Sequence, residues 1–122
     1  MDYPKLKDRP RTEAEITKEI RYYLNNAGIW HYKQWQGLGS LHGISDIIGI
    51  YKGRYLAIEV KRPGKSPSDK QQAFLERVDS QGGFAICVHS WEELAKFLED
   101  AEQPQRTIDL PQVKRISRDG LS

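Results

Sequence analysis

Two acidic residues and a lysine near the middle of the chain have types and spacing suited to metal-assisted chemistry. They are Asp46, Glu59 and Lys61, in the segment GISDIIGIYKGRYLAIEVKR at residues 43–62. Carboxylates a few ångströms apart repel each other and favour a divalent, oxygen-binding ion such as Mg²⁺ or Mn²⁺. Such an ion lowers the pKa of bound water and polarises a phosphate, while a lysine offsets developing charge. These residues, with the backbone carbonyl of Val60 as a further ligand, are candidates for phosphodiester cleavage.

Strand periodicity predicts how these groups are arranged. Residues 55–61 alternate as a β-strand does, so Glu59 and Lys61 share one face while Ile58 and Val60 point into the opposite layer. A charged pair is therefore expected beside a core strand.

A hairpin is expected to bring Asp46 to the same place. Residues 46–51 form a second apolar run, and Lys52-Gly53-Arg54 reads as a tight turn between the two runs. Pairing across that turn places residues whose numbers sum to about 106 opposite each other. Asp46 then lies near position 60, between Glu59 and Lys61, and a slip of one residue would preserve the proximity.

The simpler interpretation of Glu59 and Lys61 is an ordinary ion pair on one face of a strand. Their setting argues against it. Asp46 begins one strand, Glu59 ends the other, and both strands are otherwise strongly apolar, where unpaired acids are disfavoured. A functional role for the carboxylates is therefore favoured.

These motifs resemble the VRR-NUC branch of the PD-(D/E)XK nuclease superfamily over about residues 12–98. The resemblance rests on Gly43-Ile44-Ser45-Asp46, on Ile58-Glu59-Val60-Lys61 and on Gln71 at the start of a helix. Ser45 stands where the superfamily name has Pro. The resemblance implies that Asp46, Glu59 and Val60 bind metal and that Lys61 is catalytic. It also implies that a glutamate on the first helix and Gln71 assist.

The helix glutamate is assigned to Glu13. A helix is expected from Thr12 onward, with apolar residues such as Ile16 and Ile20 at helical spacing. Thr12 and Glu15 match a capping box, which gives Glu15 a structural role and leaves Glu13 for the site. The alternative is that Glu13 only stabilises the positive end of the helix dipole.

The helix expected over about residues 67–80 has two possible N-termini. Pro67 could occupy its first position after Ser66, or Ser68 and Gln71 could form a capping box. The second option would give Gln71 a structural role. A site role for Gln71 is favoured here, with Gln72 as the alternative.

Clusters of basic residues indicate contact with nucleic acid. The formal net charge is only +2, which excludes a polybasic DNA-coating protein. Arg62, Lys65 and Lys70 nevertheless surround the candidate site, and His42 precedes it, so these four are candidate nucleic-acid contacts. The alternatives are a solvated basic face and, for His42, an incidental loop histidine.

The order of elements predicts an α/β fold, α-β-β-β-α-β-α, with a mixed central sheet flanked by helices. The first strand is expected over residues 29–35, and the strands on either side of the second helix should be parallel. The resemblance implies a restriction-endonuclease-like core. The expected domains are a basic N-terminal arm at 1–11, a VRR-NUC-like domain at 12–100 and a polar tail at 101–122.

Other function classes are disfavoured. The glycine-rich segment 36–43 lacks the P-loop pattern, which argues against nucleotide hydrolysis. A single cysteine, Cys87, excludes an intramolecular disulfide. No apolar stretch is long enough to span a bilayer, so a cytoplasmic protein without membrane contact is expected, in a bacterium or a phage-infected host.

The expected function is that of a Mg²⁺- or Mn²⁺-dependent DNA endonuclease. The resemblance implies a homodimer acting on branched DNA such as Holliday junctions, with Trp30, Tyr22 and the tail as candidate interface elements. A phage or mobile-element origin would suit such a compact nuclease. The alternatives are a flap or restriction-like nuclease, a non-catalytic nucleic-acid-binding module, and an adaptor domain with a purely structural ion pair.

Overall fold

The computed structural model describes residues 10–35 and 43–101. Its elements are α2 (Glu13–Asn26), β1 (His31–Lys33), β2 (Ile47–Tyr51), β3 (Arg54–Val60), α3 (Asp69–Ser80), β4 (Phe84–Val88) and α4 (Trp91–Ala101). This order confirms the expected α-β-β-β-α-β-α arrangement. Most of the expected arm and nearly all of the tail lie outside the described residues.

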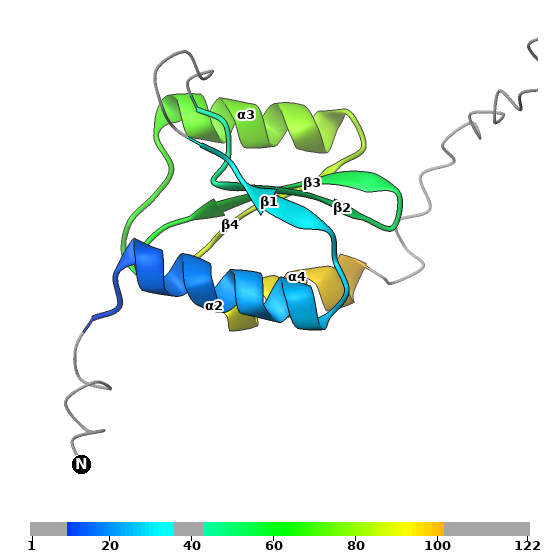
Figure 1. Ribbon diagram of the computed structural model, residues 1–122. Helices are drawn as coiled ribbons and strands as arrows, with labels where there is room; N and C mark the ends of the chain where they lie inside the picture. The colour runs from blue at the N-terminus through cyan, green and yellow to red at the C-terminus, as the bar shows by residue number, and fades with distance from the viewer. Residues whose placement is uncertain (1–9, 36–42, 102–122) are drawn as a thin grey trace, which may run out of the picture.

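The sheet is mixed, as predicted. Its strand order is β1-β2-β3-β4, with β1–β2 and β2–β3 antiparallel and β3–β4 parallel. In Figure 1, α3 covers one face of this sheet while α2 and α4 cover the other. No helix of the described part of the chain is long and apolar enough to cross a membrane.

The β2–β3 register differs from the prediction by one residue. Tyr51 pairs with Arg54 and Ile47 with Ile58, so Asp46 stands opposite Glu59 and not opposite position 60. The cause is the turn, which contains two residues, since Lys52 and Gly53 have φ of 51° and 77°. Positive φ at both positions is the geometry of a two-residue hairpin turn, whereas a three-residue turn was expected.

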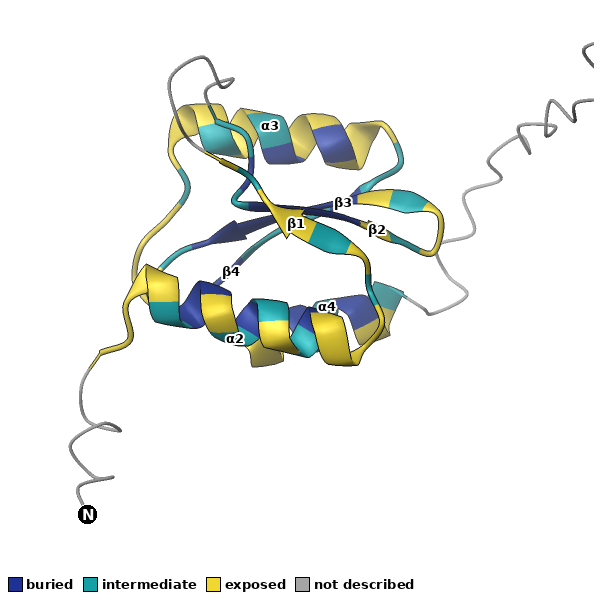
Figure 2. Ribbon diagram, viewed as in Figure 1, coloured by how far each residue is buried: buried dark blue, intermediate teal, exposed yellow. Residues whose placement is uncertain are grey.

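Two apolar clusters fill the space on either side of the sheet. On the α2 and α4 face, strand residues such as Ile47 and Ile58 pack against helix residues such as Ile20 and Leu94. On the α3 face, a smaller cluster comprises Ile48, Ala57, Leu75 and Val78. Because α2 and α3 pack on opposite faces of β3, it is buried on both faces over most of its length (Figure 2).

Helices α2 and α3 both begin with capping boxes. In α2, Thr12 Oγ1 accepts from the Glu15 backbone N–H at 3.1 Å, and Glu15 Oε1 accepts from the Thr12 N–H at 2.9 Å. In α3, Ser68 and Gln71 make the same reciprocal pair. The second of the two starts weighed for α3 is therefore the one observed.

The first strand is shorter than the expected 29–35. β1 is an edge strand that pairs only with the short strand β2, so regular pairing covers three residues. Single backbone hydrogen bonds continue at both ends, from Gln34 N to Asp46 O at 2.7 Å and from Ile50 N to Trp30 O at 3.1 Å. The end of β1 is thereby tied to the residue that begins the candidate site.

Part of the α3 face of the sheet carries exposed apolar side chains. The register places Trp30, Tyr32, Ile50 and Tyr55 on this face, and each is 41% to 63% exposed. Trp30, Tyr32 and Ile50 are exposed because α3 packs on β3 and β4 and leaves the β1–β2 half of the face open. Tyr55 lies near the start of β3, paired with Ile50. These four residues are called the aromatic patch below.

Replacing Ile58 by Ala should test the importance of the central strand. Ile58 is fully buried, so removing its side chain leaves a cavity and should lower the free energy of unfolding by roughly 2 to 5 kcal/mol. Urea denaturation followed by circular dichroism measures this. Glu99→Ala is the control, because Glu99 is exposed on α4 and its truncation should cost much less. Equal losses in the two variants would contradict this description of the core.

Candidate active site

Asp46 and Glu59 lie next to each other at the end of the sheet where β2 begins and β3 ends. Asp46 immediately precedes β2, and the β2–β3 register brings it opposite Glu59. Asp46 Oδ2 accepts a hydrogen bond of 2.8 Å from the Val60 backbone N–H. This bond fixes the Asp46 side chain against β3, next to Glu59.

Glu59 is a carboxyl group in the protein core. The residue is 1% exposed, and its Oε1 atom has no hydrogen-bond partner. A buried polar group without a partner costs roughly 1 to 3 kcal/mol, and more if it is charged. The fold therefore carries an unsatisfied acceptor at this position, which is characteristic of a site that binds something else.

Lys61 lies beside Glu59, as the strand alternation predicted. Its Nζ is 3.8 Å from Glu59 Oε2, and its side chain is 18% exposed. Ile58 and Val60 point to the opposite face, where they join the core beneath α2 and α4. One ammonium group thus lies next to two carboxyl groups on one face of the sheet.

The pKa of Glu59 is raised to about 8, and burial is the largest cause. The charge of Asp46 and a side-chain hydrogen bond with Asp46 also raise it, the charge of Glu13 adds a smaller increase, and Lys61 opposes these effects. A carboxyl group with this pKa holds its proton at neutral pH. A cation placed between Asp46 and Glu59 would remove that preference, because it would stabilise both charged forms.

Glu13 is close enough for its charge to act on Glu59. Glu13 occupies the first position of α2. Glu15, the other acid in this first turn, is engaged in the capping box. Figure 1 shows that α2 and α3 begin at the same end of the sheet, the end where β3 finishes. Helix N-termini carry partial positive charge, so both helices favour anionic groups in this region.

Gly43 sets the distance between the loop that carries Asp46 and helix α3. Its φ is +85°, and a Cβ at this position would lie 2.7 Å from the Lys70 backbone oxygen. Any larger residue would push the loop away from the first turn of the helix. The glycine of the Gly43-Ile44-Ser45-Asp46 motif therefore allows the close approach that places Asp46.

Gln71 is placed by its role in the α3 cap. Its side-chain oxygen accepts from the Ser68 N–H at 2.8 Å, while Gln72 donates to Glu76 at 3.0 Å. Gln71 therefore has the capping role that was the alternative to a role in the site. A contribution of Gln71 to catalysis stays a prediction.

The three predicted basic contacts are exposed around the site. Arg62 and Lys65 lie in the loop after β3, and Lys70 lies in the first turn of α3. His42 lies outside the described residues. The three cations are therefore available to a ligand that approaches Asp46 and Glu59.

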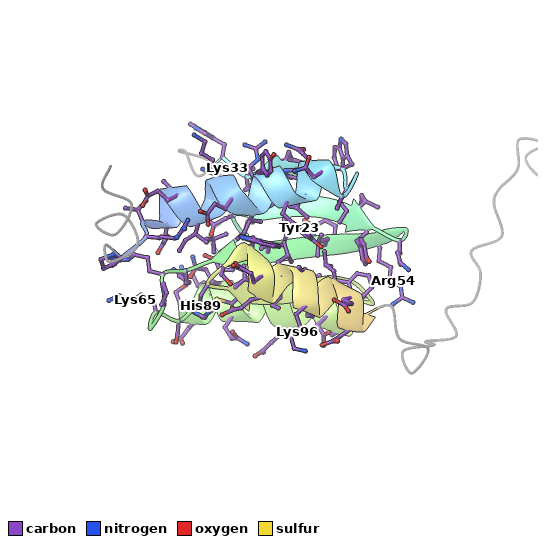
Figure 3. The ribbon with its side chains drawn as sticks, turned by 90° about the horizontal axis from the view of Figure 1, so that it is seen from below. Tyr23, Lys33, Arg54, Lys65, His89 and Lys96 are labelled. Atoms are coloured by element: carbon purple, nitrogen blue, oxygen red, sulfur yellow. The ribbon has the colours of Figure 1, made fainter. Side chains whose placement is uncertain are left out.

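Two residues at the site were not predicted from the sequence. His89 Nε2 lies 3.0 Å from the Lys65 carbonyl oxygen, and its Nδ1 lies 3.2 Å from Glu93 Oε1, so His89 ties the loop after β3 to α4. Figure 3 shows Lys65 and His89 together at one end of the molecule. The hydrogen bond to Lys65 contributes most to raising the pKa of His89.

The second residue is Cys87, which pairs with Glu59 across the parallel strands. Burial, and then the charge of Glu59, raise the pKa of the Cys87 thiol to about 11, so it is neutral at physiological pH. The sequence predicted that β3 and β4 are parallel but did not give their register. Without the register, neither Cys87 nor His89 could be placed at the site.

The donor groups fit a hard divalent ion in part. Within residues 10–35 and 43–101, no three His, Cys, Asp or Glu side chains converge closely enough to hold a metal. Two carboxylates are present, and the Val60 carbonyl points to the same side of β3 as its N–H, towards Asp46. Mg²⁺ commonly binds through one or two carboxylates and retains several waters, so this oxygen set suits it.

A family model described as the VRR-NUC domain matches residues 11–92, which is more than half of the chain. The match spans the strands and helices that hold Glu13, Asp46, Glu59, Lys61 and Gln71. A search among curated proteins finds no significant match.

Solved structures show the same fold. One described as "VRR_NUC domain" is 24% identical, with a TM-score of 0.60, over 71% of this chain and 94% of the other. Another, described as "VRR_NUC domain protein", is 17% identical, with a TM-score of 0.61, over 75% and 88%. These likenesses confirm the restriction-endonuclease-like α/β fold.

The raised pKa of Glu59 predicts that the metal-free protein loses stability as pH rises. Between about pH 5 and pH 8 the folded protein holds a proton on Glu59 that the unfolded chain, with a carboxyl pKa near 4.5, has released. Stability falls with pH where the folded state binds more protons. The free energy of unfolding in EDTA should therefore decrease by a few kcal/mol over this range.

Glu59→Gln is the matched variant for this prediction, because it keeps the shape and removes the titration. His89 also has a raised pKa, and its contribution likewise falls as pH rises, so the difference between the two proteins isolates Glu59. Urea denaturation at about pH 5 and pH 8 provides the measurement. Identical pH dependence in wild type and Glu59→Gln would show that Glu59 titrates normally.

Proposed function

The chain belongs to the VRR-NUC domain family, and from that premise we propose that it is a metal-dependent DNA endonuclease. The family is one of nuclease-type domains. The observation that carries the proposal is the buried Glu59 carboxyl group, which has an unpartnered oxygen and lies beside Asp46 and Lys61. An ion-binding site explains why the fold retains this costly arrangement.

In this proposal Asp46, Glu59 and the Val60 carbonyl hold Mg²⁺ or Mn²⁺. Such an ion, when bound, lowers the pKa of a water molecule and polarises the scissile phosphate. Hydrolysis breaks one P–O bond of the backbone, adds the hydroxyl of water to phosphorus and gives a proton to the leaving oxygen. The Lys61 ammonium group lies where it can stabilise the negative charge that develops on the phosphate.

The surrounding residues have supporting roles in the same proposal. Glu13 adds negative charge near the ion, directly or through water. Gln71 supports the site from the first turn of α3. Arg62, Lys65 and Lys70, together with His42, contact the phosphates of the DNA.

We further propose that the substrate is branched DNA, such as a Holliday junction, and that a homodimer cleaves it. A two-fold symmetric protein can present two sites to opposed strands. The aromatic patch of Trp30, Tyr32, Ile50 and Tyr55 supports a partner on this side of the sheet, because contiguous exposed apolar side chains mark interaction surfaces.

A non-catalytic nucleic-acid-binding module is the main alternative. It would gain nothing from Asp46 and Glu59, since carboxylates near phosphate weaken binding. The burial of Glu59 without a partner for Oε1 therefore favours the enzyme. Flap-like or restriction-like specificity would be a different substrate for the same site.

Lys61→Ala should slow cleavage strongly while the protein remains folded. Loss of a charge that stabilises the transition state reduces rates by about 100-fold to 1,000-fold. The assay incubates wild type and variant with labelled four-way junction, flap, single-stranded and linear duplex DNA, in Mg²⁺, Mn²⁺ or EDTA. Products are resolved on denaturing gels.

Lys96→Ala is the control, because Lys96 lies exposed on α4 with Asp100 as its only ion-pair partner in the described region. Symmetric, metal-dependent nicks in the junction would support the proposed substrate, and cleavage of flaps or linear duplex would replace it. If wild type cuts no substrate with either metal, the binding module becomes the better description.

The homodimer can be tested separately by sedimentation equilibrium. A charge introduced by Tyr32→Glu in the aromatic patch should convert the dimer to a monomer, because burying an unpaired carboxylate is unfavourable. Ala73→Glu places the same charge on the exposed side of α3 and should leave the dimer intact. A wild-type protein that is monomeric at all concentrations would contradict this part of the proposal.

A further inference from the structure

A basic groove lies between α2 and β1, outside the candidate active site. It has a volume of about 510 Å³ and is lined by Ala14, Thr17, Lys18, Arg21, Tyr22, Asn25 and Lys33. Three of these side chains are cationic, and none is acidic. The combination selects an anionic ligand, because every charge on the lining is positive.

The positive charge of the groove is not neutralised by its neighbours. Arg21 Nε donates to His31 Nε2 at 3.4 Å, and His31 Nδ1 lies 3.0 Å from the Ile29 carbonyl oxygen. Both contacts of the imidazole are satisfied by the tautomer in which Nδ1 donates and Nε2 accepts. Across residues 10–35 and 43–101, no ion pair involves Lys18, Arg21 or Lys33. The guanidinium is thus positioned without losing its charge.

One end of the groove lies near the candidate site in the chain, on the α2 side of the sheet, whereas Asp46 and Glu59 face the α3 side. Ala14 follows Glu13 on α2, and Lys33 pairs with Ile47, the residue after Asp46. In Figure 3, Lys33 lies alongside α2. From Ala14 to Asn25 the helix extends about 16 Å at 1.5 Å per residue, so the lining runs from this end towards the far end of α2.

We propose that this groove binds the sugar-phosphate backbone of the nucleic acid that enters the active site. The inference rests on the proposed function and adds a second contact surface to the basic residues around the site. About 16 Å corresponds to about five phosphates at 3.4 Å of rise per strand. Three cations along this length can each contact a phosphate, and Tyr22 and Asn25 provide neutral groups that can hydrogen-bond to phosphate or sugar.

The test measures DNA binding without cleavage. The triple variant Lys18→Gln, Arg21→Gln and Lys33→Gln removes the groove charges and leaves Asp46, Glu59 and Lys61 unchanged. Fluorescence anisotropy in EDTA, with labelled junction and duplex DNA over about 50 to 300 mM KCl, gives the dependence of affinity on salt. A triple control, Lys52→Gln, Arg77→Gln and Lys96→Gln, makes the same change in net charge at the β2–β3 turn, on α3 and on α4.

We expect the groove variant to bind at least about 10-fold more weakly at the lowest salt, with a salt slope smaller by about three, since each phosphate contact contributes about 0.9. The control should change the slope by less than one. Thermal denaturation should show both variants folded. Equal slopes for groove and control variants would overturn the inference.

The same experiment separates the groove from the proposed nuclease activity. If wild type cleaves DNA but the groove variant binds like the control, the groove inference fails and the enzyme stands. If wild type cleaves nothing but its binding depends on Lys18, Arg21 and Lys33, the nuclease proposal fails and the groove stands as a nucleic-acid contact.

Discussion

The burial of the Glu59 carboxyl group is the constraint on which the site depends. Glu59 lies on the central strand β3, 1% exposed, with one oxygen lacking any hydrogen-bond partner. Burial and the charge of Asp46 raise its pKa to about 8, so without a cation the group holds a proton at neutral pH. Lys61, at 3.8 Å, compensates only in part. The fold without a metal ion is therefore less stable than the same fold with a cation beside the Glu59 carboxylate.

The rest of the structure fixes the groups around Glu59 from several directions. The Val60 N–H holds Asp46, and the absence of a side chain at Gly43 lets the preceding loop approach α3. The N-termini of α2 and α3 lie at this end of the sheet, on opposite faces, and His89 ties the loop after Lys61 to α4. Because each contact is made by a different element, the site depends on the whole fold and not on one rigid segment.

The sequence predicted the parts of this arrangement that follow from local periodicity. Alternation along β3 placed Glu59 and Lys61 together, and the capping pattern separated Glu13 from Glu15. The register was wrong by one residue because the turn at Lys52 and Gly53 contains two residues. The position of Cys87 depends on parallel pairing across a helix. The basic groove joins α2 to β1, so no local pattern in the sequence could reveal it.

The most direct test of the central claim is Mn²⁺ binding, measured by electron paramagnetic resonance as the loss of the free-ion signal. Wild type should bind Mn²⁺, whereas Glu59→Gln should bind it at least about 10-fold more weakly, as expected when a metal site loses a charged oxygen ligand. Glu99→Gln, which removes an exposed acid on α4, should bind like wild type. Equal Mn²⁺ affinity in Glu59→Gln and wild type would contradict the assignment of this buried carboxylate as a metal ligand.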